Sequence, residues 1–444
     1  MLPEYLAKAV PNPPSKRAPW YANTAPSYAG IFLWVAFYKA IAGETLAHAP
    51  LSLCLLGLAI AGLLCYLLYY KAPAMLGMQT GYPLYVVGSS TFGTAGGYIM
   101  PGLLMGLLQI GWFAVATLVA TDFLLKGVGM KDAAPGSVPF IVVGVIWGLS
   151  LSWVGAKGIQ YVAKIATYLN FIPLLMLVIV LFQTIGGVSS YQIPAGQQND
   201  YVAFTKIIAI VIGFFATAGA AGADFGMNSR NQSDVKWGGL VGVGLAALIA
   251  AGLPLISVAG AHGLNPNIGW DYSDVMQAFG GPITPVMFIL FALASIPPTC
   301  FCAFIAGNSF STMIPGVPRV SSTMLGAAVG IILAVTGVAG NLVSFFTIVG
   351  ASFGPICGAM AADYILAGRR WAGPREGVNM AGYLAWAIGF VVGILPLPFV
   401  PLSADVKAYL EPAGLFGFIV GFVVYTVLAK AGMQPKTVAM PKAS

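Results

Sequence analysis

Charged residues are scarce in this sequence. Asp, Glu, Lys and Arg make up only 7% of the 444 residues, whereas about a quarter of a typical soluble domain is charged. A soluble chain of this length could not cover its surface with so few charges. The composition therefore excludes a soluble enzyme, a nucleic-acid-binding protein and a disordered chain.

Cysteine and histidine are scarce as well. The five cysteines all lie in apolar stretches and are typical of small buried hydrophobic residues. With two histidines in the whole chain, we expect neither a metal centre nor a cofactor. The sequence also lacks the paired Asp, Ser-His or His clusters of an intramembrane enzyme and the repeated filter motif of a channel. We therefore expect a protein that is not an enzyme.

Long apolar runs dominate what is present. Hydrophobic residues make up 59% of the chain, and a membrane helix needs about 20 of them in succession. Runs of this length fall near 29–47, 51–70, 101–121, 138–156, 160–184, 204–222, 238–260, 283–305, 322–339, 342–366, 380–400 and 412–430. The pattern predicts an all-α polytopic membrane protein with about twelve transmembrane helices.

The distribution of basic residues indicates the topology. If the N-terminus is cytoplasmic, most of the 20 Lys and Arg residues fall in cytoplasmic loops or tails, as the positive-inside rule requires. We therefore expect a plasma (inner) membrane protein with both termini in the cytoplasm. Its expected parts are a tail over 1–28, a ten-helix core over 29–366, two further helices over 380–430 and a tail over 431–444.

Glycine and proline predict two interrupted helices. The run 204–222 is rich in Gly and Ala around its midpoint, and the run 283–305 contains Pro297 and Pro298. Non-helical backbone at membrane depth is tolerated only where it is buried or lines a cavity. Transporters use such breaks to present backbone groups to substrate and ion.

Gln109 and Trp112 are the first candidate site residues. They are three residues apart in the run 101–121, so they share a helix face. An uncharged amide beside a flat aromatic ring suits a planar, polar, neutral ligand. The alternative is that Gln109 bonds a neighbouring helix while Trp112 packs against lipid.

Two further positions suit the same ligand. Phe214 and Phe215 follow Gly213, and one of these rings could form the second wall of an aromatic sandwich. Asn308 presents a donor and an acceptor, which suits the edge of a nucleobase. The alternatives are an ordinary core phenylalanine and, for Asn308, a helix C-cap beside Gly307.

Lys39 is the most unusual residue. It lies within the run 29–47, five residues before Glu44. A lysine at the centre of a membrane helix costs about 2.5–3.5 kcal/mol on insertion scales, which favours a function. Lys39 could replace a bound cation or release a proton. The alternative is that it snorkels to the interface or pairs with Glu44.

Four segments resemble the nucleobase–cation symporter family 1, whose members include cytosine permease and the hydantoin and allantoin transporters. These segments are GMQTGYPLYVVGSSTFG (77–93), LLQIGWFAV (107–115), FFATAGAAGADFGMNSR (214–230) and ADYILAGRRW (362–371). The resemblance implies a LeuT-like fold, in which spans 1–5 and 6–10 form two inverted repeats and two helices are added. It also implies a secondary transporter that imports a nucleobase or related planar heterocycle by cation symport with alternating access.

The resemblance also assigns roles within a mid-membrane site among spans 1, 3, 6 and 8. Trp112 and Phe215 would sandwich the substrate ring, and Gln109 would hydrogen-bond it. Gly213 and Phe214 would contribute backbone groups. The expected partners are a small heterocycle (of the cytosine, uracil, purine, hydantoin or allantoin class), a coupling cation and membrane lipids, with no nucleic acid and with a monomeric chain.

The remaining implied residues concern span 8 and the coupling ion. Asn308 would complete the substrate site. The family's sodium site uses carbonyls of a broken first helix and hydroxyls of the eighth, where this sequence offers only Ser295 and Thr299. We therefore expect either Na⁺ coupling or proton coupling through Lys39 or Glu44. A transporter of the same fold for another solute, such as an amino acid or a vitamin precursor, is the alternative function.

Overall fold

The apolar runs of the sequence are helices in the computed structural model, which describes residues 2–39, 41–169, 171–314 and 316–440. No β-strand occurs in these ranges. Nine of the described helices are long and apolar enough to cross a membrane, and two shorter apolar helices span Arg319–Val335 and Met380–Ile394. With a first span that is interrupted between Phe32 and Val35, they account for the twelve expected spans.

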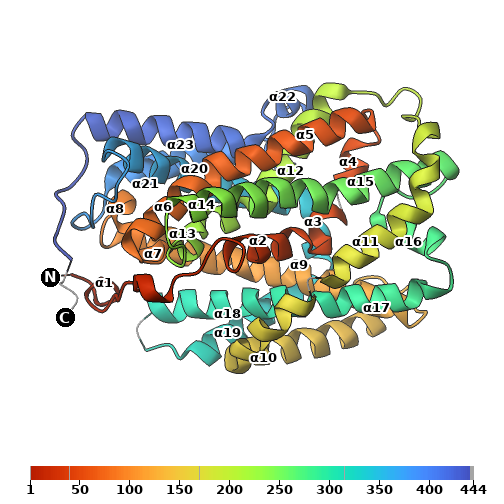
Figure 1. Cartoon of the computed structure of the whole chain (residues 1–444), viewed down its shortest axis with the longest axis horizontal. Helices are drawn as coiled ribbons and strands as arrows, with labels where there is room; N and C mark the ends of the chain where they lie inside the picture. The colour runs from red at the N-terminus through yellow and green to blue at the C-terminus, as the bar shows by residue number, and fades with distance from the viewer. Residues whose placement is uncertain (1, 40, 170, 315, 441–444) are drawn as a thin grey trace.

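Most of the first six spans run along the long axis of the molecule, whereas α11 crosses it obliquely (Figure 1). They comprise α2 (Thr24–Phe32), α3 (Val35–Lys39) and α4 (Ile41–Thr45); α5 (Leu51–Leu64), η2 (Cys65–Tyr70) and α6 (Lys71–Thr80); η3 (Tyr98–Leu103) and α9 (Leu104–Gly127); α10 (Val138–Leu169); α11 (Phe171–Thr184); and α12 (Asp200–Ala220) with α13 (Gly222–Gly226).

The last six spans follow the same axis. They comprise α14 (Gln232–Gly239), η5 (Leu240–Leu245) and α15 (Ala246–Leu264); α17 (Thr284–Ala294) and α18 (Ile296–Met313); α19 (Arg319–Val335); α20 (Leu342–Leu366); α21 (Met380–Ile394); and α23 (Ala413–Lys430). Short helices lie in the connections: α1 (Glu4–Ala7), α7 (Leu84–Val87), α8 (Ser89–Phe92), α16 (Tyr272–Phe279) and α22 (Ala404–Tyr409).

Two helix breaks have the positions that the sequence and the resemblance predict. The first span is interrupted between Phe32 and Val35. The eighth is interrupted at Ser295, two residues before Pro297. Proline lacks the N–H that would continue the helical ladder, which is why a break precedes it.

The sixth span departs from the expectation. Helix α12 continues through its Gly- and Ala-rich midpoint to Ala220, and the interruption lies only at Ala221. The small residues serve packing instead, because a Cβ atom added at Gly213 would come within 2.4 Å of the carbonyl oxygen of Phe346 in α20. The expected boundary between the fourth and fifth spans, at 156/160, is also wrong, since it falls inside α10.

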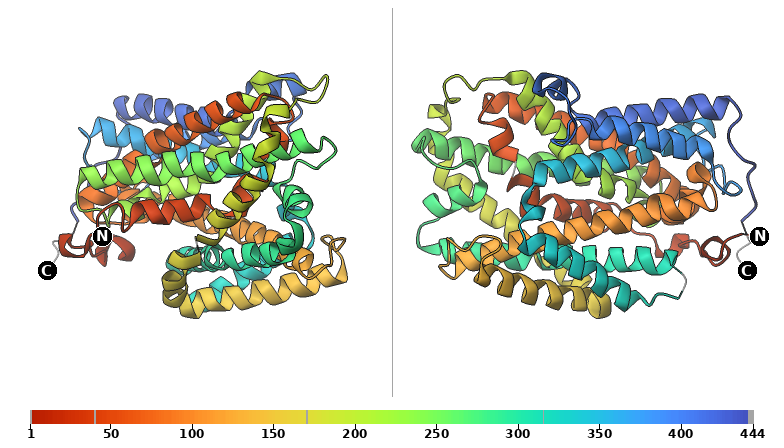
Figure 2. Two further views of the ribbon diagram at one scale, coloured as in Figure 1. Left: turned by 45° about the vertical axis from the view of Figure 1, so that its right-hand side comes forward. Right: turned by 180° about the vertical axis from the view of Figure 1, so that it is seen from behind.

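The arrangement places one helix at the centre. Helix α9 packs against α17, α18 and α19 on one side and against α20 on the other, as the view from behind shows (Figure 2). Helix α1 and the described segment that follows α23 lie at one end of the molecule, whereas α16 lies at the opposite end (Figure 1). All five cysteines are unpaired and buried, as expected.

Candidate substrate site

Trp112 lies at the centre of a buried aromatic cluster where four spans meet. Its ring centroid is 5.5 Å from Trp34 at the break in the first span, and 5.2 Å from Phe214 in α12. Phe345 and Phe346 of α20 contact it at 4.8 and 5.6 Å. Trp112 is only 4% exposed, so its ring faces protein and not lipid.

The two adjacent phenylalanines have different neighbours. The ring of Phe214 meets Trp112 edge to face, with an angle of 80° between the planes. The ring of Phe215 points to the other side, where it stacks on Phe32 at 5.4 Å and contacts Tyr28 at 5.5 Å. The structure therefore brings Phe214, and not Phe215, against Trp112.

Three polar groups in or near this cluster lack a strong hydrogen-bond partner. The indole nitrogens Nε1 of Trp34 and Trp112 are buried without a hydrogen-bond acceptor among the described residues. Gln109, which is also buried, donates Nε2 to the sulfur of Met105 at 3.6 Å, and a thioether is a weak acceptor. Buried donors normally have partners, so these three groups indicate a place where a polar ligand binds.

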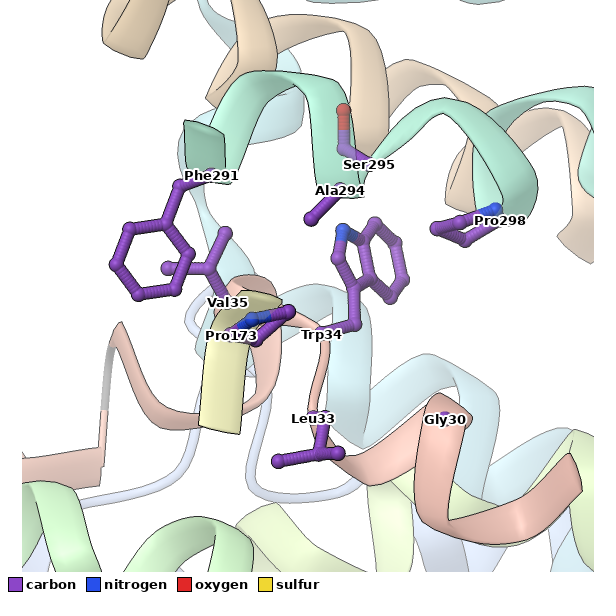
Figure 3. Close-up of a pocket in the computed structure, with 9 residues that line it drawn as sticks. All are labelled: Gly30, Leu33, Trp34, Val35, Pro173, Phe291, Ala294, Ser295 and Pro298. Atoms are coloured by element: carbon purple, nitrogen blue, oxygen red, sulfur yellow. The ribbon is translucent and has the colours of Figure 1, made fainter. Parts of the chain in front are cut away.

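A cavity lies beside the cluster, between the two helix breaks (Figure 3). Its volume of about 20 Å³ holds roughly one water molecule. Its wall consists of Gly30, Leu33, Trp34, Val35, Pro173, Phe291, Ala294, Ser295 and Pro298. The broken backbone of the first and eighth spans therefore faces one small internal space.

The hydroxyl residues of the eighth span are engaged within their own helix. The Ser295 hydroxyl donates to the carbonyl of Ala292 and the Thr299 hydroxyl donates to the carbonyl of Ser295, each at 2.7 Å. Ser295 lines the cavity, but its hydroxyl points away from the Trp34 ring (Figure 3). The side chains that line the cavity are thus mainly apolar, with one indole and one hydroxyl among them.

Asn308 lies inside α18, so it is not the C-cap of that helix. It is half-buried, and its carbonyl accepts a hydrogen bond from the Ser311 hydroxyl. The next residue, Ser309, packs against Gly106 of α9, one helical turn before Gln109. Ser309 and Phe310, which follow Asn308, therefore lie in the contact between the eighth and third spans.

Lys39 belongs to a separate charged cluster at the end of the molecule opposite the chain termini. Its Nζ lies 3.3 Å from carboxylate oxygens of both Asp122 and Asp271. Lys126 shares Asp122 at 3.0 Å and also donates to the hydroxyl of Ser273. The cluster joins α3, α9 and the start of α16. Asp122 directly follows the apolar run 101–121, and the sequence analysis did not single it out as a partner of Lys39.

Glu44 lies away from Lys39. It is half-buried in α4, near Glu411 in the connection before α23. Burial raises the pKa of Glu411, and the charge of Glu44 adds to this effect. Glu411 accepts a hydrogen bond from the backbone of Ala413 and pairs with Lys206 at 4.0 Å. Lys39 is thus paired with two aspartates rather than with Glu44.

Comparison with known proteins identifies the family. A family model described as a permease for cytosine/purines, uracil, thiamine and allantoin matches residues 11–421. The chain belongs to this family.

Curated relatives of the family are permeases. Cytosine permease of Escherichia coli (strain K12) is 26% identical over 351 residues, which cover 76% of this chain and 77% of that protein. A putative allantoin permease of the same strain is 22% identical over 414 residues, covering 81% of each chain. The protein is therefore a multi-pass membrane transporter, and its relatives are not enzymes.

Solved structures show the fold. Mhp1, a nucleobase-cation-symport-1 family transporter in a closed conformation with bromovinylhydantoin bound, matches with a TM-score of 0.71 and 18% identity, over 97% of this chain and 95% of that chain. A Na⁺-coupled sialic acid symporter matches with a TM-score of 0.58 and 14% identity, over 99% and 94%. The expected LeuT-like fold of two inverted repeats with two added helices is confirmed.

The family segment 362–371 contributes a structural hub near the chain termini. Its Asp363 is buried and accepts hydrogen bonds from Ser90 at 2.6 Å, Tyr425 at 2.8 Å and Arg375 at 3.1 Å. These residues come from α8, α23 and the connection after α20. The partner of Asp363 is therefore Arg375, and not the arginine pair within the segment.

The family segment 214–230 contributes a second structural carboxylate. Asp224 of α13 accepts a hydrogen bond from the backbone N–H of Leu84, at the start of α7. Burial raises the pKa of Asp224 to about 6, although the bond from Leu84 acts in the opposite direction. Asp224 thus joins the end of the sixth span to the connection between the second and third.

Proposed function

We propose that this chain is a secondary transporter that imports a nucleobase or related planar heterocycle by cation symport, with alternating access. The observation that carries the proposal is the contact of Trp112 with Phe214 and Trp34, in which two buried indole N–H groups lack acceptors. A flat ligand with polar edges would satisfy both features, because its faces stack and its edges accept hydrogen bonds.

In the proposed site, Trp112 forms one wall and Phe214 the other. Gln109 exchanges hydrogen bonds with the ligand, and Asn308 of α18 adds a second amide. The backbone at Gly213 lies one residue before Phe214, so it borders the same space. Phe215 supports the wall from behind, because it packs on Phe32 and not on Trp112.

The contact between the walls supports a cycle of opening and closing. The centroids of Trp112 and Phe214 are 5.2 Å apart and their planes are nearly perpendicular, so no planar ring fits between them. Substrate entry therefore requires these rings to separate. Phe345 and Phe346 also cover Trp112, which makes the start of α20 a segment that moves when the site opens.

An uncharged substrate is favoured over an amino acid. A carboxylate would need a free cation or exposed helix N-termini in both the first and sixth spans, and α12 of the sixth span has no break before Ala221. Lys39, the lysine one turn beyond the cavity-lining Val35, is already neutralised by Asp122 and Asp271. The aromatic cluster around Trp112 instead holds two neutral indole donors without acceptors among the described residues, and these suit carbonyl or ring-nitrogen acceptors.

We propose two places for ion coupling: a cation site at the cavity beside Ser295, and a proton site at the ion pairs of Lys39. Experiments with separate Na⁺ and proton gradients can distinguish them. Ser295 lines the cavity between two broken helices, and Thr299 lies one helical turn further along α18, where its hydroxyl donates to the Ser295 carbonyl. Lys39 pairs with Asp122 and Asp271 across three elements, so a proton on either aspartate would weaken this link. Glu44, beside Glu411, is a further acidic group near the same end of the molecule.

Uptake by proteoliposomes tests the proposal. Labelled cytosine, uracil, adenine, hydantoin and allantoin are supplied with Na⁺ and proton gradients imposed separately, and amino acids serve as the comparison panel. We expect saturable uptake of at least one heterocycle, driven by one gradient and lost in Trp112→Ala. Failure of every heterocycle to bind or enter would contradict the proposal, and uptake of an amino acid would support the alternative solute class.

A further inference from the structure

Trp34 occupies a position that the sequence did not single out. It lies in the break between α2 and α3, where its ring contacts Trp112 and forms part of the wall of the cavity. The side chain is 8% exposed, and its indole N–H has no acceptor among the described residues. In Figure 3 the indole nitrogen lies on the edge of the ring that faces Ala294, another residue of the cavity wall.

Trp34 and Trp112 present the same chemistry to this space. An indole N–H can only donate a hydrogen bond, whereas the amide of Gln109 can donate or accept. The two tryptophan rings are 5.5 Å apart, and both donors are buried and unpaired. A ligand that leaves them unpaired loses affinity, because a buried donor without a partner carries its full desolvation penalty.

We propose that Trp34 is a specificity-determining residue which, together with Trp112, selects heterocycles that present carbonyl oxygens over counterparts that present amino groups. This inference rests on the proposed function. A carbonyl oxygen accepts a hydrogen bond from the indole. An amino group at the same ring position directs an N–H toward the indole N–H. The indole donor then stays without an acceptor, and the two donors repel each other.

The preferred substrate class follows from the presence of two indole N–H donors, those of Trp34 and Trp112. Two neighbouring indoles are satisfied together by two acceptors on one planar ring, as in dioxopyrimidines, dioxopurines and hydantoins. Gln109 cannot impose this choice, because its amide can turn to match either a carbonyl or an amino group. Discrimination therefore depends on the tryptophans, whose donors cannot become acceptors.

The test uses ligand pairs in which the C=O group and adjacent ring N–H of one member are replaced by an amino group and a ring-nitrogen acceptor in the other. Uracil is compared with cytosine, hypoxanthine with adenine, and xanthine with guanine, by equilibrium binding to the purified full chain. We expect the oxo member of the bound pairs to bind about tenfold more tightly or better. Equal or tighter binding of the amino members would overturn the inference while leaving the proposed function intact.

Two variants assign the preference to Trp34. Trp34→Phe keeps an aromatic ring but removes the N–H, so we expect the oxo preference to fall to near unity. Trp147→Phe is the matched control, because the Trp147 N–H is also buried and has no acceptor among the described residues. Its ring lies on α10, where it packs both on the main core and on the small cluster of Leu151, Val162 and Cys300.

The outcomes separate the two proposals. A full oxo preference in a folded Trp34→Phe protein, or its loss in Trp147→Phe, would overturn the role of Trp34. If Trp34→Phe does not fold, the ligand pairs on the wild-type protein decide the inference. A folded wild-type protein that binds no heterocycle would overturn the proposed function and this inference with it.

Discussion

Phe215 lies flat on Phe32, with ring centroids 5.4 Å apart and planes 8° apart, while its neighbour Phe214 meets Trp112. Adjacent residues on a helix point about 100° apart, so only one of the two rings can face the third span. This relationship divides the pair into a ring that supports the fold and a ring that borders the proposed substrate space.

Substitution of the two phenylalanines should therefore have different effects. We expect Phe214→Ala to raise the KM for the transported heterocycle about tenfold, since one stacked ring is worth about 1–3 kcal/mol. Phe215→Ala should instead lower the thermal stability, because removal of a buried phenylalanine leaves a cavity. Uptake kinetics and melting of the purified proteins measure the two effects. A KM effect confined to Phe215→Ala would reinstate Phe215 as the wall.

The ion pairs of Lys39 with Asp122 and Asp271 should keep α16 packed against the rest of the protein. Lys39→Met leaves Asp122 and Asp271 without their shared partner, and breaking a partly buried ion pair is costly. We expect labelling of a reporter cysteine at Met276, a buried position of α16, to accelerate about tenfold. Maleimide labelling is suitable because the native cysteines are all buried.

Lys206→Met is the control for this experiment. Lys206 is also partly buried and ion-paired, but its partner is Glu411, so the labelling rate at position 276 should not change. Equal rates in Lys39→Met and the unmodified background would show that the cluster does not restrain α16.

The hydrogen-bonded group around Asp363 should need Arg375 for the stability of the folded protein. Arg375→Ala leaves a buried carboxylate without its cation, which we expect to cost about 3–5 kcal/mol. Arg370→Ala, at an exposed position whose Nε donates only to the Ala367 carbonyl, should change stability by less than about 0.5 kcal/mol. Thermal unfolding in detergent compares the two, and equal losses would contradict the assignment.

Asp224 should make stability depend on pH. Burial raises its pKa from 3.8 to about 6 in the folded protein, so the folded state holds this proton more tightly than the unfolded state. The resulting stabilisation is present below about pH 4 and is lost as the pH rises through about 6. Asp224→Asn cannot ionise, so its melting temperature should match the wild type near pH 4 and exceed it near pH 7.

The control for the pH experiment is Asp405→Asn, at an exposed position in α22. This variant should follow the wild-type pH profile throughout. A parallel profile for Asp224→Asn would show that Asp224 does not bind its proton more tightly in the folded state.

Features with a simple physical signal could be predicted from the sequence. The length of the apolar runs predicts twelve spans, and Pro297 predicts the break beside Ser295. Gln109 and Trp112 share a helix, and both are buried there. The break in the sixth span could not be located, because glycine permits both a break and a close helix contact. Only the three-dimensional structure shows that Gly213 is used for contact with Phe346.

Features that depend on distant partners could not be predicted. Asp122 is 83 residues from Lys39, and Asp271 lies in a connection with no regular pattern. Phe214 and Phe215 have apolar surroundings on all sides, so hydrophobicity does not distinguish them. Trp34 lies in a run of aromatic and apolar residues, and nothing in that run reveals that its N–H lacks an acceptor.

The salt bridges around Lys39 have a consequence for the energetics of the transport cycle. Lys39 and Lys126 are matched by Asp122 and Asp271, so this set of four side chains is electrically neutral, and Asp274 beside it adds one negative charge when ionised. A charge that crosses the membrane field gains or loses about 2.3 kcal/mol per 100 mV. When these four side chains move together, their charges cancel, so the membrane potential should contribute almost no energy to the movement. The rate of this movement should therefore be nearly the same with and without a membrane potential.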